Sequence, residues 1–485
     1  MTLKAKLSTC LLAFLLTSTM FSCESFTNIE NTQEDPTQVE TQAHPITTVT
    51  QTDAPTETES KTEQTAPLPP TDENYCIGLC YELSKDGSYY TVSGIEDDCT
   101  DTAVYIPPTY AGKPVKAIGE KAFYRNHTVQ SFFIPEGVER IEEDAFHDCS
   151  AYYIQLPQSL QYIGNYAFGF CDSLQTMELS DNISYIGSNA FTYCENLQSI
   201  HIPSSLSVIE PNTFSYCFAL EEITIPDSVT FIGNYAFFSC RALEKVTLSK
   251  QLKEIDVCAF SHCKNLKEVV WPESLEIVGG SAFSFCNALK SVALYEGLRS
   301  IGNGAFYECN AIVSITIPNS VTYLGAAFYS CYRLDTVIIG QGVTSIDART
   351  FAHCVNLKNL TLPNGITHIG DEAFAGCRAL KEIILPEGLI STGYMVFNDC
   401  KSLKSVTLPD SLKTLGNDFF NACPKLETIT LGKGLQQVGY FSIDRLPLLT
   451  TVNYRGSEEE WNEIVFTGDN DLPKLSINFN FEDPS

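Results

Sequence analysis

The chain has 485 residues, of which 30 are basic and 59 acidic, and a formal charge of −29 at neutral pH. A surface with this excess of acid repels phosphate backbones and anionic lipid headgroups. We therefore expect no nucleic acid partner, and we expect contact with a membrane only through a covalent lipid anchor.

The N-terminus has the layout of a secretory signal peptide. Residues 1–6 carry two lysines and no acid, and residues 7–20 form an uncharged, largely apolar run. This run is shorter than the roughly 20 residues that a membrane-spanning helix needs. We predict a signal peptide at residues 1–22 and export of the chain.

The predicted signal peptide ends in Met20-Phe21-Ser22-Cys23, which resembles the lipobox of bacterial lipoproteins. The resemblance implies that Cys23 is acylated on sulfur and becomes the first residue of the mature protein. Acyl chains would then anchor it to the bacterial membrane and present it at the cell surface. Met20 and Phe21 depart from the usual motif, so an ordinary signal-peptidase site stays an alternative.

Residues 24–74 are dominated by Thr, Gln, Glu and Pro. Aromatic and branched aliphatic residues are scarce there, so this segment cannot bury enough apolar surface to offset the entropy of ordering the chain. We interpret residues 23–74 as the lipidated cysteine followed by a disordered stalk, which holds a domain away from the membrane.

Residues 117–454 consist of internal repeats, about fifteen in number. One such unit cannot cover its own apolar side, so successive units must stack as a solenoid. An Ala-Phe-x-x-Cys element recurs every 22 or 23 residues. It places thirteen cysteines at one position of the repeat: Cys149, Cys171, Cys194, Cys217, Cys240, Cys263, Cys286, Cys309, Cys331, Cys354, Cys377, Cys400 and Cys423.

Each repeat predicts one short strand followed by a corner. Val246 and Leu248 have period-2 spacing, which places both on one face of a strand and Thr247 on the other. A glycine follows later in the repeat, as at Gly233 and Gly370, and is expected to permit a backbone turn that a Cβ would hinder. The Ala-Phe pair is expected to form a short helical or 3-10 corner.

The repeat resembles the leucine-rich repeat of about 23 residues found in BspA-like bacterial surface proteins. The resemblance implies a right-handed, β-rich leucine-rich-repeat solenoid of about fifteen turns with N- and C-terminal caps. Residues 75–116 resemble the N-terminal β cap, residues 117–454 form the array, and residues 455–485 resemble the closing cap. BspA-like proteins are associated with binding to host matrix proteins and to other cells, so the resemblance also implies adhesion.

The thirteen repeated cysteines predict a buried, reduced column, because a core thiol behaves as a small hydrophobe. Cys76, Cys80 and Cys99 lie outside this column, and a disulfide among them stays open. The histidines are scattered, and neither a metal-ligand spacing nor a catalytic constellation is present. We therefore expect no cofactor, no metal and no enzymatic activity.

Two outward-facing columns are candidate ligand surfaces. The first is hydroxylic and follows the predicted strand: Thr224, Thr247, Thr316, Thr361, Thr407 and Thr430. Strand propensity on a solvated face would explain it equally. The second is aromatic and could instead pack along the stack: Tyr162, Tyr185, Phe231 and Tyr323.

The function that the sequence favours is cell-surface adhesion or recognition, with an extracellular protein or glycan as ligand. A glycan-binding module and a structural surface scaffold are the alternatives.

Overall fold

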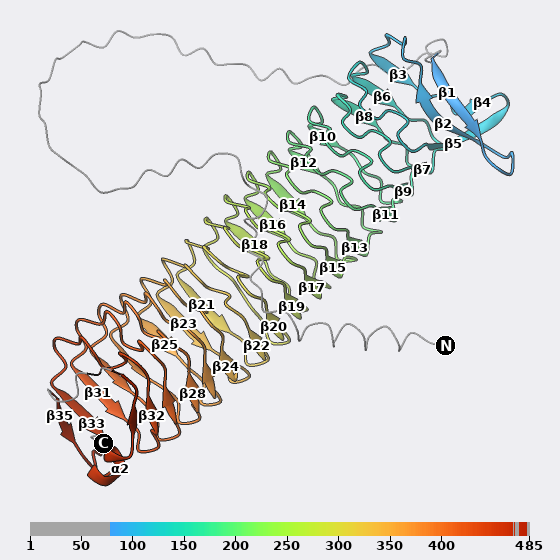
Figure 1. The fold of residues 1–485 in the computed structure, drawn as a ribbon. Coiled ribbons are helices and arrows are strands. Elements are labelled where there is room, and N and C mark those ends of the chain that lie inside the picture. Colours follow the sequence, from blue (N-terminus) through green and yellow to red (C-terminus); the bar gives the residue numbers. More distant parts are fainter. Residues whose placement is uncertain (1–77, 469, 471–474, 483–485) are drawn as a thin grey trace, which may run out of the picture. The chain divides into compact units, whose positions relative to one another are not determined.

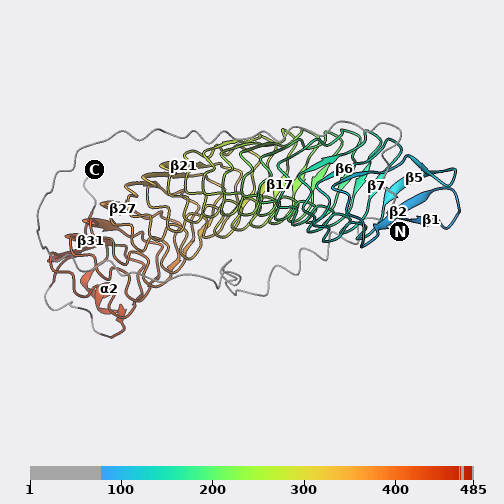
Figure 2. The same ribbon diagram turned by 90° about the horizontal axis from the view of Figure 1, so that it is seen from above.

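The computed structural model describes residues 78–468, 470 and 475–482. The predicted signal peptide, Cys23, the stalk and Cys76 lie outside the described residues. The described part is a solenoid whose turns stack in sequence order (Figure 1; Figure 2). It has about 17 turns, close to the predicted fifteen.

Every regular turn contributes to two columns of parallel strands. The first column contains β3 (Ala103–Tyr105), β6 (Ser131–Phe133), β8 (Tyr153–Gln155), β10 (Thr176–Met177), β12 (Ser199–Ile200), β14 (Glu222–Thr224), β16 (Lys245–Thr247), β18 (Glu268–Val270), β21 (Ser314–Ile317), β23 (Thr336–Ile339), β25 (Asn359–Thr361), β27 (Glu382–Ile384), β29 (Ser405–Thr407), β31 (Thr428–Leu431), β33 (Thr451–Tyr454) and β35 (Ser476–Asn478).

The second column lies at the residues just before the Gly step of the repeat. Its strands are mostly two residues long, too short to show any alternation in the sequence, which is why the repeat pattern predicted only the first column. It contains β5 (Lys113–Ile118), β7 (Arg140–Ile141), β9 (Tyr162–Ile163), β11 (Tyr185–Ile186), β13 (Val208–Ile209), β15 (Phe231–Ile232), β17 (Glu254–Ile255), β19 (Ile277–Val278), β20 (Ser300–Ile301), β22 (Tyr323–Leu324), β24 (Ser345–Ile346), β26 (His368–Ile369), β28 (Ser391–Thr392), β30 (Thr414–Leu415), β32 (Gln437–Val438) and β34 (Val465–Phe466).

The ends of the stack continue these columns. At the N-terminal end, β2 (Tyr90–Ile95) pairs in parallel with β5, while β1 (Leu79–Leu83) and β4 (Thr109–Tyr110) add antiparallel strands. At the C-terminal end, α2 (Glu458–Asn462) precedes β34 and begins with a capping box formed by Ser457 and Glu460. The terminal turns thus share both sheets with the array.

The Ala-Phe corner is a turn, not the predicted helical or 3-10 segment. Two residues of most corners, such as Asp144 and Asp148, adopt left-handed backbone angles with φ of 56° and 55°. This conformation points their amides toward the next turn, so that the Asp148 N–H donates to the Gly169 carbonyl at 2.7 Å and the Phe146 N–H to that of Ala167 at 2.8 Å. The corner therefore alternates hydrogen bonds to the next turn with bonds inside its own turn, such as the one from the His147 N–H to the Asp144 carbonyl at 3.1 Å.

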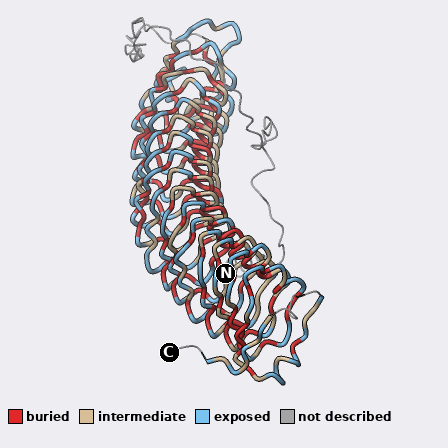
Figure 3. Tube along the Cα trace, turned by 90° about the vertical axis from the view of Figure 1, so that its left-hand side faces the viewer, coloured by how far each residue is buried: buried red, intermediate tan, exposed pale blue. Residues whose placement is uncertain are grey.

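A ladder of phenylalanine rings runs through the core. The Phe of each Ala-Phe corner stacks on its copies in the neighbouring turns, with ring centroids 5.1 Å apart for Phe123 and Phe146 and 5.0 Å for Phe237 and Phe260. These rings are almost fully buried. Buried segments recur in every turn along the stack (Figure 3). Since no single turn encloses its own ring, the ladder makes folding of each turn depend on its neighbours.

The repeated cysteines form a buried column beside this ladder. Twelve of them, from Cys171 to Cys423, donate an S–H hydrogen bond to the carbonyl of the ladder phenylalanine in the preceding turn. The Sγ to O distance is 3.1 Å from Cys194 to Phe168 and 3.2 Å from Cys286 to Phe260. The column is thus composed of thiols that act as hydrogen-bond donors.

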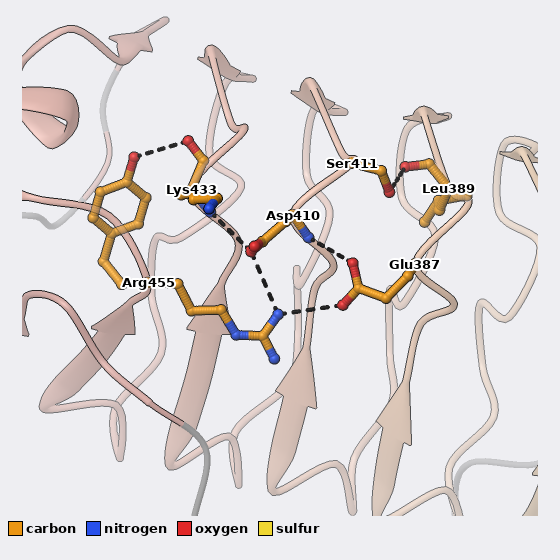
Figure 4. A network of polar contacts seen from close by, with 7 residues as sticks. Glu387, Leu389, Asp410, Ser411, Lys433 and Arg455 are labelled. Carbon is orange, nitrogen blue, oxygen red and sulfur yellow. Dashed lines mark hydrogen bonds and ion pairs between the residues drawn. The ribbon is translucent and has the colours of Figure 1, made fainter.

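The loops between the two strand columns carry a second set of contacts between turns (Figure 4). A Glu387 carboxylate oxygen accepts a hydrogen bond from the Asp410 amide at 3.2 Å, and Asp410 repeats the contact with the Lys433 amide. Arg455 then pairs with both carboxylates, at 3.4 Å and 3.5 Å. One guanidinium therefore ties the last turns of the array together.

The first column is interrupted beside Trp271. This residue takes the inward position that Ile225 occupies in another turn, and its ring lies 5.0 Å from Phe283. In the following turn, residues 291–294 form no strand, and Val292 and Leu294 are half-buried. The larger side chain replaces the regular packing of that turn, and its buried Nε1 has no hydrogen-bond partner among the described residues.

The glycine of the repeat permits close approach between turns, because a Cβ would meet the backbone of the preceding turn. Neither Gly233 nor Gly370 has a positive φ. A Cβ on Gly370 would lie 2.5 Å from the Ala348 nitrogen of the preceding turn, and one on Gly233 would lie 2.8 Å from the Pro211 nitrogen. At Gly233 and Gly370 an added Cβ would therefore have to displace the backbone of the preceding turn.

We predict that Gly370→Ala lowers the urea midpoint of unfolding by a free-energy equivalent of about 1 to 3 kcal/mol, because its Cβ must displace backbone. Gly365→Ala is the matched control in the same turn, since its Cβ would meet only the Gln341 carbonyl oxygen at 3.8 Å. This control should change stability by about 1 kcal/mol or less. Equal losses for the two variants would contradict the close-approach explanation.

The thiol column also makes a labelling prediction. Burial raises the pKa of the Cys149, Cys194 and Cys331 thiols to about 12. Because the thiolate is the reactive form, these thiols should resist iodoacetamide at pH 8 in the folded protein. Exposed Cys80 should react, and peptide mapping by mass spectrometry should find the column labelled only in denaturant. Modification of the column in the folded state would contradict this.

Candidate binding surfaces

The threonine column lies on the outward face of the first strand column, although its members differ in exposure. Thr224, Thr316 and Thr361 are exposed, and Thr247 and Thr407 are half-buried. The outward placement follows from the alternation of side chains along a strand, whose inward residues point into the core.

Thr430 is not available on this face, contrary to the sequence prediction. It lies in β31, between β29 and β33, and is only 5% exposed. Its register partners are Thr407 and Asn453, and Asn453 is also buried. The repeat position alone could not reveal this, because burial here depends on the last turns of the stack, which depart from the regular sequence.

Aliphatic residues that the sequence prediction omitted share the column with the threonines. Val270, Ile338 and Ile384 occupy the same repeat position and are 44%, 45% and 77% exposed. In the sheet, Ile338 lies between Thr316 and Thr361. The column is therefore made of uncharged, β-branched residues, while charged residues such as Glu222 and Glu382 lie two positions earlier on the same strands. We call this column the strand face: Thr224, Thr247, Val270, Thr316, Ile338, Thr361, Ile384 and Thr407. The sequence shows these aliphatic residues at the same repeat position as the threonines, but the predicted surface was chosen for its hydroxyl groups.

The predicted aromatic column contains one stacked pair and two separate rings. Tyr162 and Tyr185 stack with centroids 5.0 Å apart and planes 12° apart, and the Arg140 guanidinium covers the Tyr162 ring at 3.8 Å. Phe231 instead pairs in register with Val208 and Glu254. The Tyr162–Tyr185 pair thus packs along the stack, and its covered ring faces are poorly placed for stacking on sugars.

Tyr323 is the most exposed of the four predicted aromatic residues, at 45%. It pairs in register with Ser300, and its hydroxyl donates to Asn303 Oδ1 at 3.3 Å. Burial of part of the ring, followed by the charge of Asp347, raises the pKa of this hydroxyl. Tyr323 therefore stands as a single ring that stays a neutral phenol at physiological pH.

A third aromatic feature runs along the corners, and we call it the corner ridge. Each ring contacts the ring of the next turn, with centroids 4.7 Å apart for Phe170 and Tyr193 and 4.1 Å for Tyr193 and Tyr216. Several corner aromatics are evident in the sequence, but their continuity is not. The ridge comprises Tyr124, His147, Phe170, Tyr193, Tyr216, Phe238, His262, Phe285, Tyr307, Tyr329 and His353.

The His262 ring of the corner ridge is half-buried. Its ring lies between Phe238 and Phe285, at 5.2 Å and 4.3 Å. Burial, followed by the charges of Lys264 and Arg241, lowers the pKa of this imidazole to about 4. At physiological pH the ridge is therefore uncharged at this turn.

Across the described residues, no group of three or more His, Cys, Asp or Glu side chains has an arrangement that could hold a metal ion. Within the same part of the chain, no helix has the length and apolarity needed to cross a membrane. The described candidate sites are therefore surfaces formed by columns of side chains.

Solved structures with related folds include three bacterial proteins. A leucine-rich repeat protein from Bacteroides ovatus is 29% identical with a TM-score of 0.68, over 82% of this chain and 100% of that one. A leucine-rich cell surface protein from Faecalibacterium prausnitzii is 24% identical, with a TM-score of 0.45, over 82% and 98%. The pneumococcal vaccine antigen PcpA is 21% identical, with a TM-score of 0.36, over 85% and 98%.

No curated protein sequence matches this chain. The BspA type leucine rich repeat region, in a form with six copies, matches at residues 116–244, 230–358 and 344–473. These ranges overlap and together span residues 116–473, which is well over half of the chain and contains both strand columns of the array. The chain belongs to the BspA-type leucine-rich repeat family.

Proposed function

We propose that this protein is a cell-surface recognition protein that binds an extracellular protein through its strand face. The observation that carries the proposal is the outward column of uncharged, β-branched residues, in which Ile384 is 77% exposed. Ile338 and Ile384 alternate in this column with threonines, whose methyl groups extend the apolar surface, and contiguous apolar patches mark interaction surfaces.

The shape of the strand face favours a macromolecular partner over a small ligand. Successive turns repeat the same outward position at a spacing of about 4.8 Å, so contact area accumulates along the stack. Shallow contacts of this kind suit a large, complementary surface, whereas a small molecule needs a concave pocket. We therefore propose binding, and not catalysis, as the activity of the array.

A protein partner fits the described surfaces better than a glycan does. Recognition of sugars by aromatic residues needs an accessible ring face, and the ring faces of Tyr162 and Tyr185 cover one another. An aliphatic and hydroxylic row offers instead the packing and hydrogen bonding common at protein interfaces. Adhesion to host matrix or to neighbouring cells is the form of recognition that we propose.

We also propose that the mature protein is exported and anchored by an acylated Cys23, with the Thr-rich segment as its stalk. The support is the Met20-Phe21-Ser22-Cys23 sequence after an uncharged apolar run. Two or more acyl chains would hold the protein stably at a membrane.

The strand face is tested by placing a charge in it. We expect Ile384→Lys to weaken binding of the purified protein to its best ligand in a panel of extracellular matrix proteins, fibronectin included, by tenfold or more, which is about 1.4 kcal/mol. Ile390→Lys is the matched control, because Ile390 is 47% exposed and precedes β28 of the other column.

If both lysine variants bind as tightly as the unsubstituted protein, the strand face is not the interface. If only a glycan array shows saturable binding, the protein-recognition proposal fails in favour of the glycan-binding alternative. Absence of saturable binding to either panel would leave the scaffold alternative.

The anchor is tested on protein isolated from its native membrane. Mass spectrometry of the N-terminal peptide should find acylated Cys23 as the first residue, and Cys23→Ala should release the protein into the medium. An N-terminus at Glu24 or beyond would show instead that cleavage follows an ordinary signal-peptidase route.

A further inference from the structure

One segment of the corner ridge combines stacked rings with carboxylates. Phe170, Tyr193 and Tyr216 occupy the corners of three successive turns, and Phe170 is 38% exposed. Asp172 and Glu195 follow the column cysteines of the first two turns by one position. We call these five residues the corner patch.

The rings of the corner patch stack on one another and stay partly accessible to solvent. The planes of Phe170 and Tyr193 are 9° apart, and those of Tyr193 and Tyr216 are 13° apart, so each inner face is covered by a neighbouring ring. Covered faces exclude stacking on a sugar ring. Edges and half-buried ring surfaces instead suit the methylene stem of a long side chain.

The carboxylates of the corner patch have no cation of their own. Asp172 and Glu195 form no ion pair with any side chain that the structure describes. Burial, followed by the charges of Glu195 and Asp148, raises the pKa of Asp172. A cationic partner would stabilise the ionised form of Asp172.

The chain itself shows which side chain fits this combination. On the same corner, in an earlier turn, Arg125 lies 5.4 Å from the Tyr124 ring centroid, and its Nε pairs with Asp148 at 3.2 Å. At the other end of the patch, the Arg241 guanidinium lies over the Phe218 ring at 4.6 Å. Arginine side chains therefore lie on both sides of the corner patch. The corners between them have aromatic rings and acidic residues but no arginine.

We propose that the corner patch is a docking surface for an arginine-bearing segment of a protein partner. The arginine stems pack against the edges of Phe170, Tyr193 and Tyr216, and the guanidinium groups pair with Asp172 and Glu195, as Arg125 pairs with Asp148 within the chain. This inference goes beyond the strand-face proposal, because the patch lies on the corners of the turns and either surface can function without the other.

The probe for this surface is a fluorescein-labelled peptide of six Gly-Arg repeats, titrated with the purified full-length protein at physiological salt. Fluorescence anisotropy should show saturable binding, at least fivefold tighter than for the matching Gly-Lys peptide, because guanidinium is planar and less strongly hydrated. The double variant Asp172→Asn, Glu195→Gln should weaken binding of the Gly-Arg peptide at least tenfold.

Matched variants separate specific docking from attraction to an acidic protein. Glu222→Gln with Glu382→Gln removes the same charge from the first-strand face, and it should change peptide affinity less than twofold. Tyr193→Ser should weaken binding about fivefold and keep the fold, because serine already occupies this left-handed corner position at Ser239 and Ser330. Phe285→Ser, which removes a ring of the ridge outside the patch, should have little effect.

Three outcomes would overturn the proposal: no saturable binding of the Gly-Arg peptide, equal affinity for the Gly-Lys peptide, or equal weakening by the two pairs of charge variants. None of these would affect the strand-face test, which uses a different probe and different substitutions. Failure of the corner patch and failure of the proposed function are therefore distinguishable.

Discussion

Contact between each side chain and its own copy one turn away is the interaction on which this structure depends. The phenylalanine ladder shows it most directly, because no turn encloses its ring and each ring is buried by those above and below it. Strand pairing, the S–H hydrogen bonds of the cysteines and the carboxylate contacts of the loops all repeat at the same spacing. Stability is therefore shared between neighbouring turns, and the array needs a different sequence only at its ends.

The same spacing converts each position of the repeat into a column. At an inward position the column becomes core, and at an outward position it becomes surface. Similar residues that repeat in an outward column tend to pack against one another, as Tyr162 and Tyr185 do by stacking. Those that depart from the column, such as Ile384 among threonines, are left for contacts outside the chain.

The sequence was sufficient to predict the solenoid and the inward face of its first strands, because period-2 spacing inside a repeat of about 23 residues is compatible with few folds besides a solenoid. The strands of the second column are too short to show a periodic pattern in the sequence. The conformation of the corner depends on hydrogen bonds to the next turn, such as that from the Asp148 N–H to the Gly169 carbonyl. Exposure also depends on neighbouring turns, so Thr430 is buried although Thr316, at the same repeat position, is exposed. Sequence periodicity therefore identifies which residues share a column, whereas only the stacked structure shows which of them are accessible.

Departures from the repeat are the most informative residues for function, since stacking already accounts for the regular positions. Arg455, for example, contacts the Glu387 and Asp410 carboxylates and so joins the loops of the last turns. Asp172 and Glu195 stand at a position of the repeat that varies from turn to turn, and they place charge beside stacked rings where no ion pair of the described chain involves them. A pair of acids beside stacked rings, between two arginine-bearing turns, therefore suits a cationic partner from outside the chain.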